Sequence, residues 1–152
     1  MKSPGDNVFY EEMARFMPVF LRAVAIRQEK ILMGGDIAIS HIVVIDVLSE
    51  KGTCTMGEIA KALNLTMSAA TSIVDKMIEK GLVSRERDKS DRRVVRVSLV
   101  SGGKALAKKI YIFRKNVSKD LYSSLTIEEK NVHMVIMKKI YDNVIRKRND
   151  KC

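Results

Sequence analysis

The fold of this chain is decided by residues 56–99, which read MGEIAKALNLTMSAATSIVDKMIEKGLVSRERDKSDRRVVRVSL. The first half of this stretch repeats apolar residues at helical spacing over residues 56–63 and again over residues 67–80. A break at residues 64–66 separates the two patterns, and Gly81 ends the second one. Because the break is so short, the two segments predict a helix-turn-helix.

The second half of the stretch is typical of a hairpin. Residues 82–87 and 94–99 alternate apolar and polar side chains, and they flank the charged segment 88–93. Such alternation predicts two strands joined by a charged tip. A helix-turn-helix followed by a hairpin is the winged helix-turn-helix arrangement, so we predict a mainly α fold with a small β-hairpin wing. Residues 53–55 are too short to predict more than a stub of strand.

Two further helical patterns precede the deciding stretch. Residues 8–33 carry apolar side chains on one helical face, although Pro18 predicts a kink or a shorter helix there. A second helix is expected to begin near Ser40, whose hydroxyl can cap free amide groups, and to stop at Gly52. Its many apolar residues indicate burial on several sides.

Residues 104–148 contain two more helical patterns, and the second opens on the capping-box pattern at residues 126–129. The helices at both chain ends carry more apolar surface than so small a module can cover, which favours pairing with a second copy. We therefore predict one unit over residues 1–152, with a winged helix-turn-helix lobe at residues 36–100. Residues 8–33 and 104–148 are predicted to form a helical dimerisation region.

Charge and composition narrow the choice of partners. The net charge is +10, and the basic excess is concentrated in the carboxyl-terminal third while the amino-terminal third is nearly neutral. Anionic partners such as nucleic acid or a membrane surface therefore become plausible. The longest apolar runs fall far short of the roughly 20 residues that a membrane span needs. Two cysteines and no signal-peptide pattern favour a cytoplasmic protein.

Residues 56–103 resemble the MarR family of bacterial transcriptional regulators, the multiple antibiotic resistance regulators. Residues 57–66 are similar to the family's first helix and turn, and residues 68–83 resemble its recognition helix and the entry to its wing. The most specific match is the wing signature Asp-x-Arg, here Asp91-Arg92-Arg93, which begins six residues after Arg85.

The resemblance implies a homodimer whose end helices interlock and whose two lobes bind a palindromic operator in double-stranded DNA, most simply as a repressor. The recognition helix would lie in the major groove and the wing arginine in the adjacent minor groove, with half-sites about 10 base pairs apart. The resemblance also implies release by a small-molecule effector bound at the junction between the dimer helices and the lobes. No cofactor is predicted.

The candidate DNA-contacting residues follow from their place on this motif, and they are Thr66, Met67, Ser68, Thr71, Ser72, Lys76, Lys89, Arg92, Arg93 and Arg96. The basic side chains would neutralise phosphates, and the small ones let the helix approach the groove. Arg85 and Asp91 are expected to brace the wing. Met67 and Ser72 stand where the family often has Arg or Lys, which predicts fewer bidentate contacts to guanine.

Other functions stay open at this stage. A winged helix can bind another protein instead of DNA, and the scarcity of arginines on the recognition helix keeps that alternative alive. The basic last helices could bind a membrane surface, but their apolar residues are committed to dimer packing in our prediction. We find no Gly-rich phosphate loop, metal-ligand cluster or nucleophile elbow, so neither an enzyme nor a metal site is predicted. His41 is expected to be structural and Cys54 an inert thiol.

Overall fold

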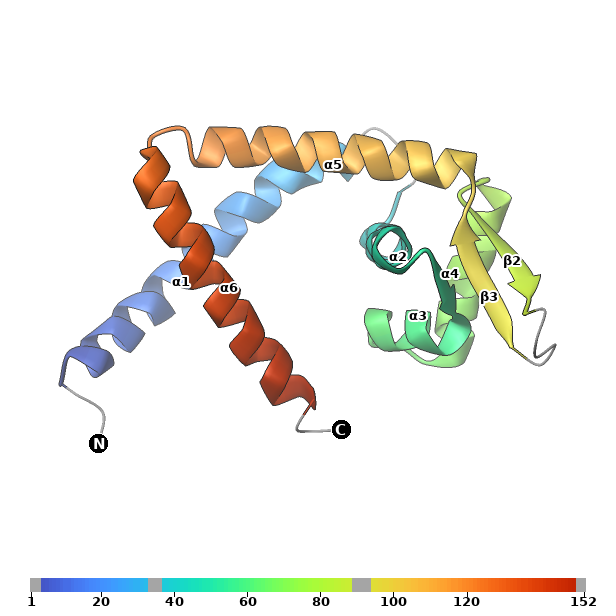
Figure 1. Ribbon diagram of the computed structural model, residues 1–152, viewed down its shortest axis with the longest axis horizontal. Helices are drawn as coiled ribbons and strands as arrows, with labels where there is room; N and C mark the ends of the chain where they lie inside the picture. The colour runs from blue at the N-terminus through green and yellow to red at the C-terminus, as the bar shows by residue number, and fades with distance from the viewer. Residues whose placement is uncertain (1–3, 33–36, 89–93, 150–152) are drawn as a thin grey trace. The chain divides into compact units, whose positions relative to one another are not determined.

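The computed structural model describes residues 4–32, 37–88 and 94–149 (Figure 1). Its elements are α1 (Pro4–Leu32), α2 (Ile39–Lys51), β1 (Thr53–Thr55), α3 (Met56–Leu63), α4 (Met67–Glu79), β2 (Val83–Arg87), β3 (Val95–Leu99), α5 (Ser101–Leu121) and α6 (Ile127–Asn149). The chain divides into two compact units, residues 1–113 and 114–152. The predicted fold class, mainly helical with a small wing, is confirmed.

The core of the first unit is formed by α2, α3, α4 and the strands. On α4, Ala70, Val74 and Met77 follow one another at intervals of four and three residues, and all three are fully buried. That spacing places them on one helical face, as the sequence predicts. They pack in a single cluster with the buried side chains of Val44, Ile45, Leu48, Cys54, Met56, Ile59, Ala60, Leu82, Val83, Val97 and Ile110.

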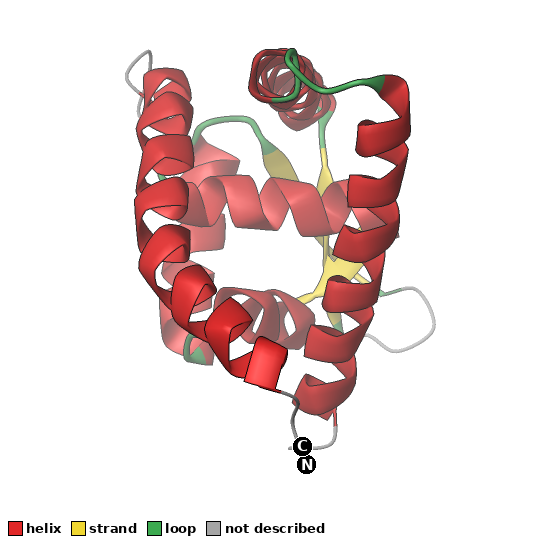
Figure 2. Cartoon of the chain, turned by 90° about the vertical axis from the view of Figure 1, so that its left-hand side faces the viewer, coloured by secondary structure: helices red, strands yellow, loops and turns green. Residues whose placement is uncertain are grey.

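The wing is part of a three-stranded antiparallel sheet, drawn in yellow in Figure 2, with the order β1-β3-β2. On the central strand, Val97 lies opposite Cys54 of β1 and Arg85 of β2. The expected stub at residues 53–55 is therefore a paired strand, and the predicted two-stranded hairpin is incomplete. Three residues are too few to display an alternation, so only tertiary pairing reveals this strand.

A capping box fixes the start of α3, the first helix of the helix-turn-helix. The Thr55 hydroxyl accepts a hydrogen bond from Glu58 N at 3.2 Å, and Glu58 Oε2 accepts one from Thr55 N at 2.8 Å. This reciprocal capping box lowers the pKa of Glu58, chiefly through the Thr55 amide and then through Lys51.

A close approach also joins α5 to the start of the wing. At Gly103, an added Cβ would lie 2.0 Å from the Leu82 carbonyl oxygen, so only glycine lets α5 pack this closely there.

Two boundary expectations need correction. Helix α1 runs without interruption from Pro4 to Leu32, so the expectation that Pro18 shortens this helix is wrong. A proline removes one backbone donor, and the neighbouring turns keep their own hydrogen bonds. Helix α2 begins at Ile39, and its N-cap is Ala38 and not Ser40. There the backbone amide of Ala38 donates to Nδ1 of His41 at 3.2 Å, which makes His41 the capping side chain.

The second unit contains the end of α5 and all of α6. The predicted capping box at its start is confirmed, because Thr126 N donates to Glu129 Oε2 at 2.8 Å and Glu129 N donates to Thr126 Oγ1 at 3.3 Å. Helix α6 leaves a row of apolar side chains at least 47% exposed: Val132, Met134, Val135, Ile136, Met137, Ile140, Tyr141 and Val144. Within the described ranges, no helix has the length and apolar character required for a membrane span.

Candidate nucleic-acid interface

Helix α4 presents a small, polar face to the outside. Ser68, Ser72, Asp75 and Lys76 are exposed, while the opposite face of the helix is buried in the core. The division follows from the helical step of about 100° per residue. The structure thus brings the sequence-predicted residues of this helix together on one accessible surface.

The first turn of α4 combines a polar cap with an apolar side chain. Thr66 is the N-cap, and its hydroxyl accepts a hydrogen bond from Ala69 N at 3.3 Å. Met67, the first helical residue, is 52% exposed. The backbone amides at the start of the helix therefore sit at its positive end, where a phosphate is favoured.

The hydroxyl groups of the next turn bond back to the helix. Thr71 Oγ1 donates to the Met67 carbonyl oxygen at 2.8 Å, and Ser72 Oγ donates to the Ser68 carbonyl oxygen at 3.3 Å. In this arrangement each hydroxyl hydrogen is engaged within the helix. The oxygens keep lone pairs that can accept a further hydrogen bond.

An ion pair ties α4 to the wing. Arg85 Nη2 on β2 donates to Asp75 Oδ1 on α4 at 2.8 Å. The sequence identifies Arg85 as a wing-bracing residue but gives no partner for it, and Asp75 is missing from the predicted set. The two residues lie ten positions apart across a turn, a separation at which no sequence periodicity indicates a contact.

Arg96 on β3 also has an acidic partner. Its Nε donates to the carboxylate of Asp88, and this contact raises the pKa of Arg96. The predicted phosphate-contacting residue is therefore engaged within the hairpin, where it joins β3 to the residue that follows the end of β2. Lys89, Asp91, Arg92 and Arg93, which complete the predicted wing set, lie outside the described residues.

A buried histidine lies near the basic end of α4. His41 is only 5% exposed. Burial lowers its pKa most, followed by the nearby charges of Lys80 and Lys76. Its Nδ1 accepts the Ala38 amide, so the neutral ring is the form that caps α2. The expected structural role of His41 agrees with this geometry.

Cys54 is the middle residue of β1, and its side chain is fully buried in the core. Burial raises the pKa of its thiol, with Glu58 adding to the effect, and a raised pKa disfavours the reactive thiolate. No group of three or more metal-ligating side chains occurs among the residues that the structure describes.

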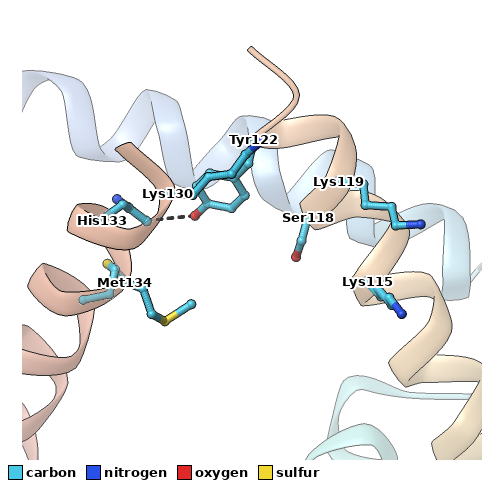
Figure 3. A pocket seen from close by; sticks show the side chains of 8 residues that line it. Lys115, Ser118, Lys119, Tyr122, Lys130, His133 and Met134 are labelled. Carbon is cyan, nitrogen blue, oxygen red and sulfur yellow. Dashed lines mark hydrogen bonds between the residues drawn. The ribbon is translucent and has the colours of Figure 1, made fainter. Parts of the chain in front are cut away.

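The second unit contains a cavity of about 630 Å³ between α5 and α6 (Figure 3). Lys115 and Lys119 contribute to it from α5, and Lys130 and His133 from α6. The Tyr122 hydroxyl lies 3.0 Å from Nε2 of His133, the contact marked by the dashed line in Figure 3. Met134 and Met137 give the cavity an apolar lining, and its charged lining residues are basic.

Comparison with known proteins agrees with this architecture. A family model described as "MarR family" matches residues 37–95. The uncharacterized HTH-type transcriptional regulator YsmB of Bacillus subtilis is 32% identical over 100 residues, which cover 66% of this chain and 68% of YsmB. A MarR family protein from Bacillus stearothermophilus has a similar structure, with a TM-score of 0.81, 25% identity and coverage of 95% of this chain and 99% of that one.

A structure of Streptococcus pneumoniae FabT in complex with DNA is also similar, with a TM-score of 0.78 and 24% identity over 90% of this chain and 98% of FabT. Fold and surface together define a winged helix-turn-helix protein. The chain belongs to the MarR family, which is a family of transcriptional regulators and not of enzymes.

Proposed function

We propose that this protein is a sequence-specific transcriptional regulator that binds double-stranded DNA in the cytoplasm. In this proposal it represses transcription from a palindromic operator as a homodimer, until a small molecule releases it. The observation that carries the proposal is the accessible polar face of α4, fixed to the wing through the 2.8 Å contact between Arg85 and Asp75. An exposed second helix of a helix-turn-helix is the element that enters the major groove. FabT, whose structure contains DNA, supports the assignment by its similar fold.

The electrostatic part of the proposal concerns phosphate contacts. Lys76 on α4 and the wing residues Lys89, Arg92 and Arg93 would neutralise phosphates or enter the minor groove. The other backbone amides of the first turn of α4, beside the Ala69 amide that Thr66 caps, would meet a phosphate at the helix start. Asp91 would brace the wing. Arg96 contributes to the positive field, but its Nε is held by Asp88, so we assign it mainly to wing geometry.

The homodimer is supported by uncovered apolar side chains in both end regions. On α1, Val8, Phe9, Phe16, Val19 and Leu21 are each at least 56% exposed, and α6 carries the similar row described above. An apolar surface this extensive is typical of a protein interface. Sedimentation should therefore give twice the 17.2 kDa mass of the chain. A monomer at micromolar concentration would contradict the dimer.

The family resemblance supports release of the DNA by a small-molecule effector. The cavity of the second unit offers lysines and an apolar lining, which together suit a small organic anion. Small aromatic carboxylates titrated into the preformed DNA complex should identify a releasing compound. Failure of all such compounds to change DNA affinity would argue against an anionic effector.

An electrophoretic mobility shift with the gene's own upstream region tests the DNA assignment. Wild-type protein should shift this fragment at low salt, and Arg93→Ala should bind more weakly with a shallower salt dependence, because one phosphate-proximal charge is lost. Lys138→Ala removes the same charge from α6, which is outside the winged helix-turn-helix in the sequence, and serves as the matched control. Absence of a shift for any genomic fragment at low salt would rule out the proposal.

A protein-binding winged helix is the second candidate, and one observation favours it. The apolar side chains of Leu65 and Met67, at the turn and the start of α4, are 45% and 52% exposed. Co-purification of a stoichiometric protein partner, together with indifference to DNA, would support this candidate over the first.

A further inference from the structure

The first two turns of α4, which we propose to face the base pairs, contain no basic side chain. From Met67 to Asp75 the helix has neither Lys nor Arg, and Lys76 follows nine residues after Met67. At a rise of about 1.5 Å per residue, that separation is about 13 Å along the helix axis. Lys76 is therefore too far along the helix to read the base pairs that Met67 would face.

The first two turns offer the groove an apolar group and hydrogen-bond acceptors. Met67 is 52% exposed, and Leu65 just before the helix is 45% exposed. The hydroxyl hydrogens of Thr71 and Ser72 bond to the carbonyl oxygens of Met67 and Ser68, so their oxygens can accept a hydrogen bond from outside the helix.

Only one base pair offers the complement of that surface on its major-groove edge. An A·T pair presents both an amino donor, on adenine N6, and an apolar methyl group, on thymine C5. A G·C pair also presents one amino donor, on cytosine N4, and two acceptors, but it has no methyl group, so the methyl group is what distinguishes the two pairs for this surface. Methionine suits the methyl contact because its flexible, polarisable side chain adapts to irregular apolar surfaces.

We infer that Met67 determines operator specificity by contacting thymine methyl groups in the major groove, with the Thr71 and Ser72 oxygens accepting from adenine amino groups. The inference rests on the proposed DNA-binding function and specifies its operator. Each half-site then contains A·T pairs under the first turn of α4, and the discrimination between A·T and G·C depends on the thymine methyl group.

The experiment begins with selection of binding sites from random duplex DNA by the full-length protein. Single thymines of the selected site are then replaced by deoxyuridine, which removes the C5 methyl group and leaves base pairing intact. Affinities are measured for wild type, Met67→Ala and Ile39→Ala. Ile39 is 68% exposed on α2 of the same unit, so its replacement is a matched loss of apolar surface.

Wild type and Ile39→Ala should lose about fourfold in affinity for each contacted methyl group, as expected for removal of one buried carbon. Met67→Ala should bind the thymine and deoxyuridine sites equally. Ser72→Arg should shift the preference at one position of each half-site towards guanine, because it supplies the missing bidentate donor.

The possible failures are distinguishable. The proposed role of Met67 is wrong if the selected half-sites have G·C pairs under the first turn of α4. It is also wrong if deoxyuridine weakens binding of Met67→Ala as strongly as binding of wild type. In both cases the proposed DNA binding still holds. If selection enriches no sequence and the protein binds no duplex, the proposed function fails, and this inference fails with it.

Discussion

Asp75 of the second helix of the helix-turn-helix accepts a hydrogen bond from Arg85 of the first wing strand, at 2.8 Å between Oδ1 and Nη2. Both side chains are partly open to solvent, with exposed fractions of 50% for Asp75 and 30% for Arg85. A pair in this setting contributes little to folding stability. Its consequence is geometric, because it joins the helix proposed to enter the major groove to the strand that leads into the wing.

Replacing Asp75 by Asn distinguishes the role of this side chain in positioning the wing from the effect of its negative charge on DNA binding. The change removes a negative charge from a surface proposed to face phosphates, so electrostatics alone would strengthen DNA binding. We expect weaker binding, because the wing loses its attachment to α4, while the free energy of unfolding changes by less than about 1 kcal/mol. Fluorescence anisotropy with labelled duplex and urea denaturation measure the two quantities.

A double-mutant cycle provides the control for that prediction. If the pair acts as a unit, Arg85→Ala combined with Asp75→Asn should weaken DNA binding by less than the sum of the two single effects. Strictly additive losses, or tighter binding by Asp75→Asn, would show that the pair does not position the wing.

The capping box of α3 should contribute measurable stability. Thr55→Ala removes the hydroxyl that accepts from Glu58 N, and such losses cost about 1 kcal/mol. Because the folded-state pKa of Glu58 is depressed below its ordinary value of 4.5, its contribution is present above that pH and is lost as the pH falls through the folded pKa. Urea titrations of wild type and Glu58→Gln in mild acid check the sign: the difference between them should shrink as the pH falls.

His41 predicts a second dependence of stability on pH. Its folded-state pKa is lowered from 6.5, so below that pH the unfolded chain binds a proton that the folded chain excludes. Stability should therefore fall as the pH drops below 6.5 towards the folded-state pKa, since burial and the nearby Lys80 and Lys76 oppose the charged ring. His41→Gln keeps a potential capping acceptor but does not titrate, and its urea midpoint should vary less over this range. An equal variation in both proteins would exclude His41 as the source.

Two glycines give a matched test of packing. Gly103→Ala would place a Cβ 2.0 Å from the Leu82 carbonyl oxygen, so we expect a loss of more than about 2 kcal/mol in the free energy of unfolding. Gly57 is also helical, but its nearest atom to an added Cβ is Thr55 Oγ1 at 3.9 Å. Gly57→Ala should therefore be neutral or stabilise by up to about 1 kcal/mol, through helix propensity. Similar melting temperatures for the two variants would contradict the close approach at Gly103.

The sequence predicts much of this fold because its signals are local. The spacing of Ala70, Val74 and Met77 indicates the buried face of α4 directly, and the capping-box pattern at residues 126–129 indicates the start of α6. Strand β1 and the contact between Asp75 and Arg85 could not be predicted in this way. Both depend on contacts between separate secondary-structure elements, and neither leaves a periodic pattern in the sequence.

The candidate interface could be predicted in part for the same reason. Thr66 and Ser72 are identifiable because a cap and an outward helical position follow from local spacing. The ion pair of Arg96 with Asp88 was not predictable, because the carboxylate reaches it across the hairpin from outside the strands. Exposure of Met67 follows from the pattern, but the back-bonded hydroxyls that accompany it become visible only in three dimensions.

Sequence-specific binding by a dimer is tested by an equilibrium titration of one selected duplex, compared with a scrambled duplex of equal length. We expect saturation at two chains per duplex and an affinity at least about 10³-fold higher for the selected sequence at physiological salt. The logarithm of the affinity should also fall linearly with the logarithm of the salt concentration. Equal affinity for the two duplexes, or saturation at one chain per duplex, would contradict a dimeric regulator that reads DNA sequence.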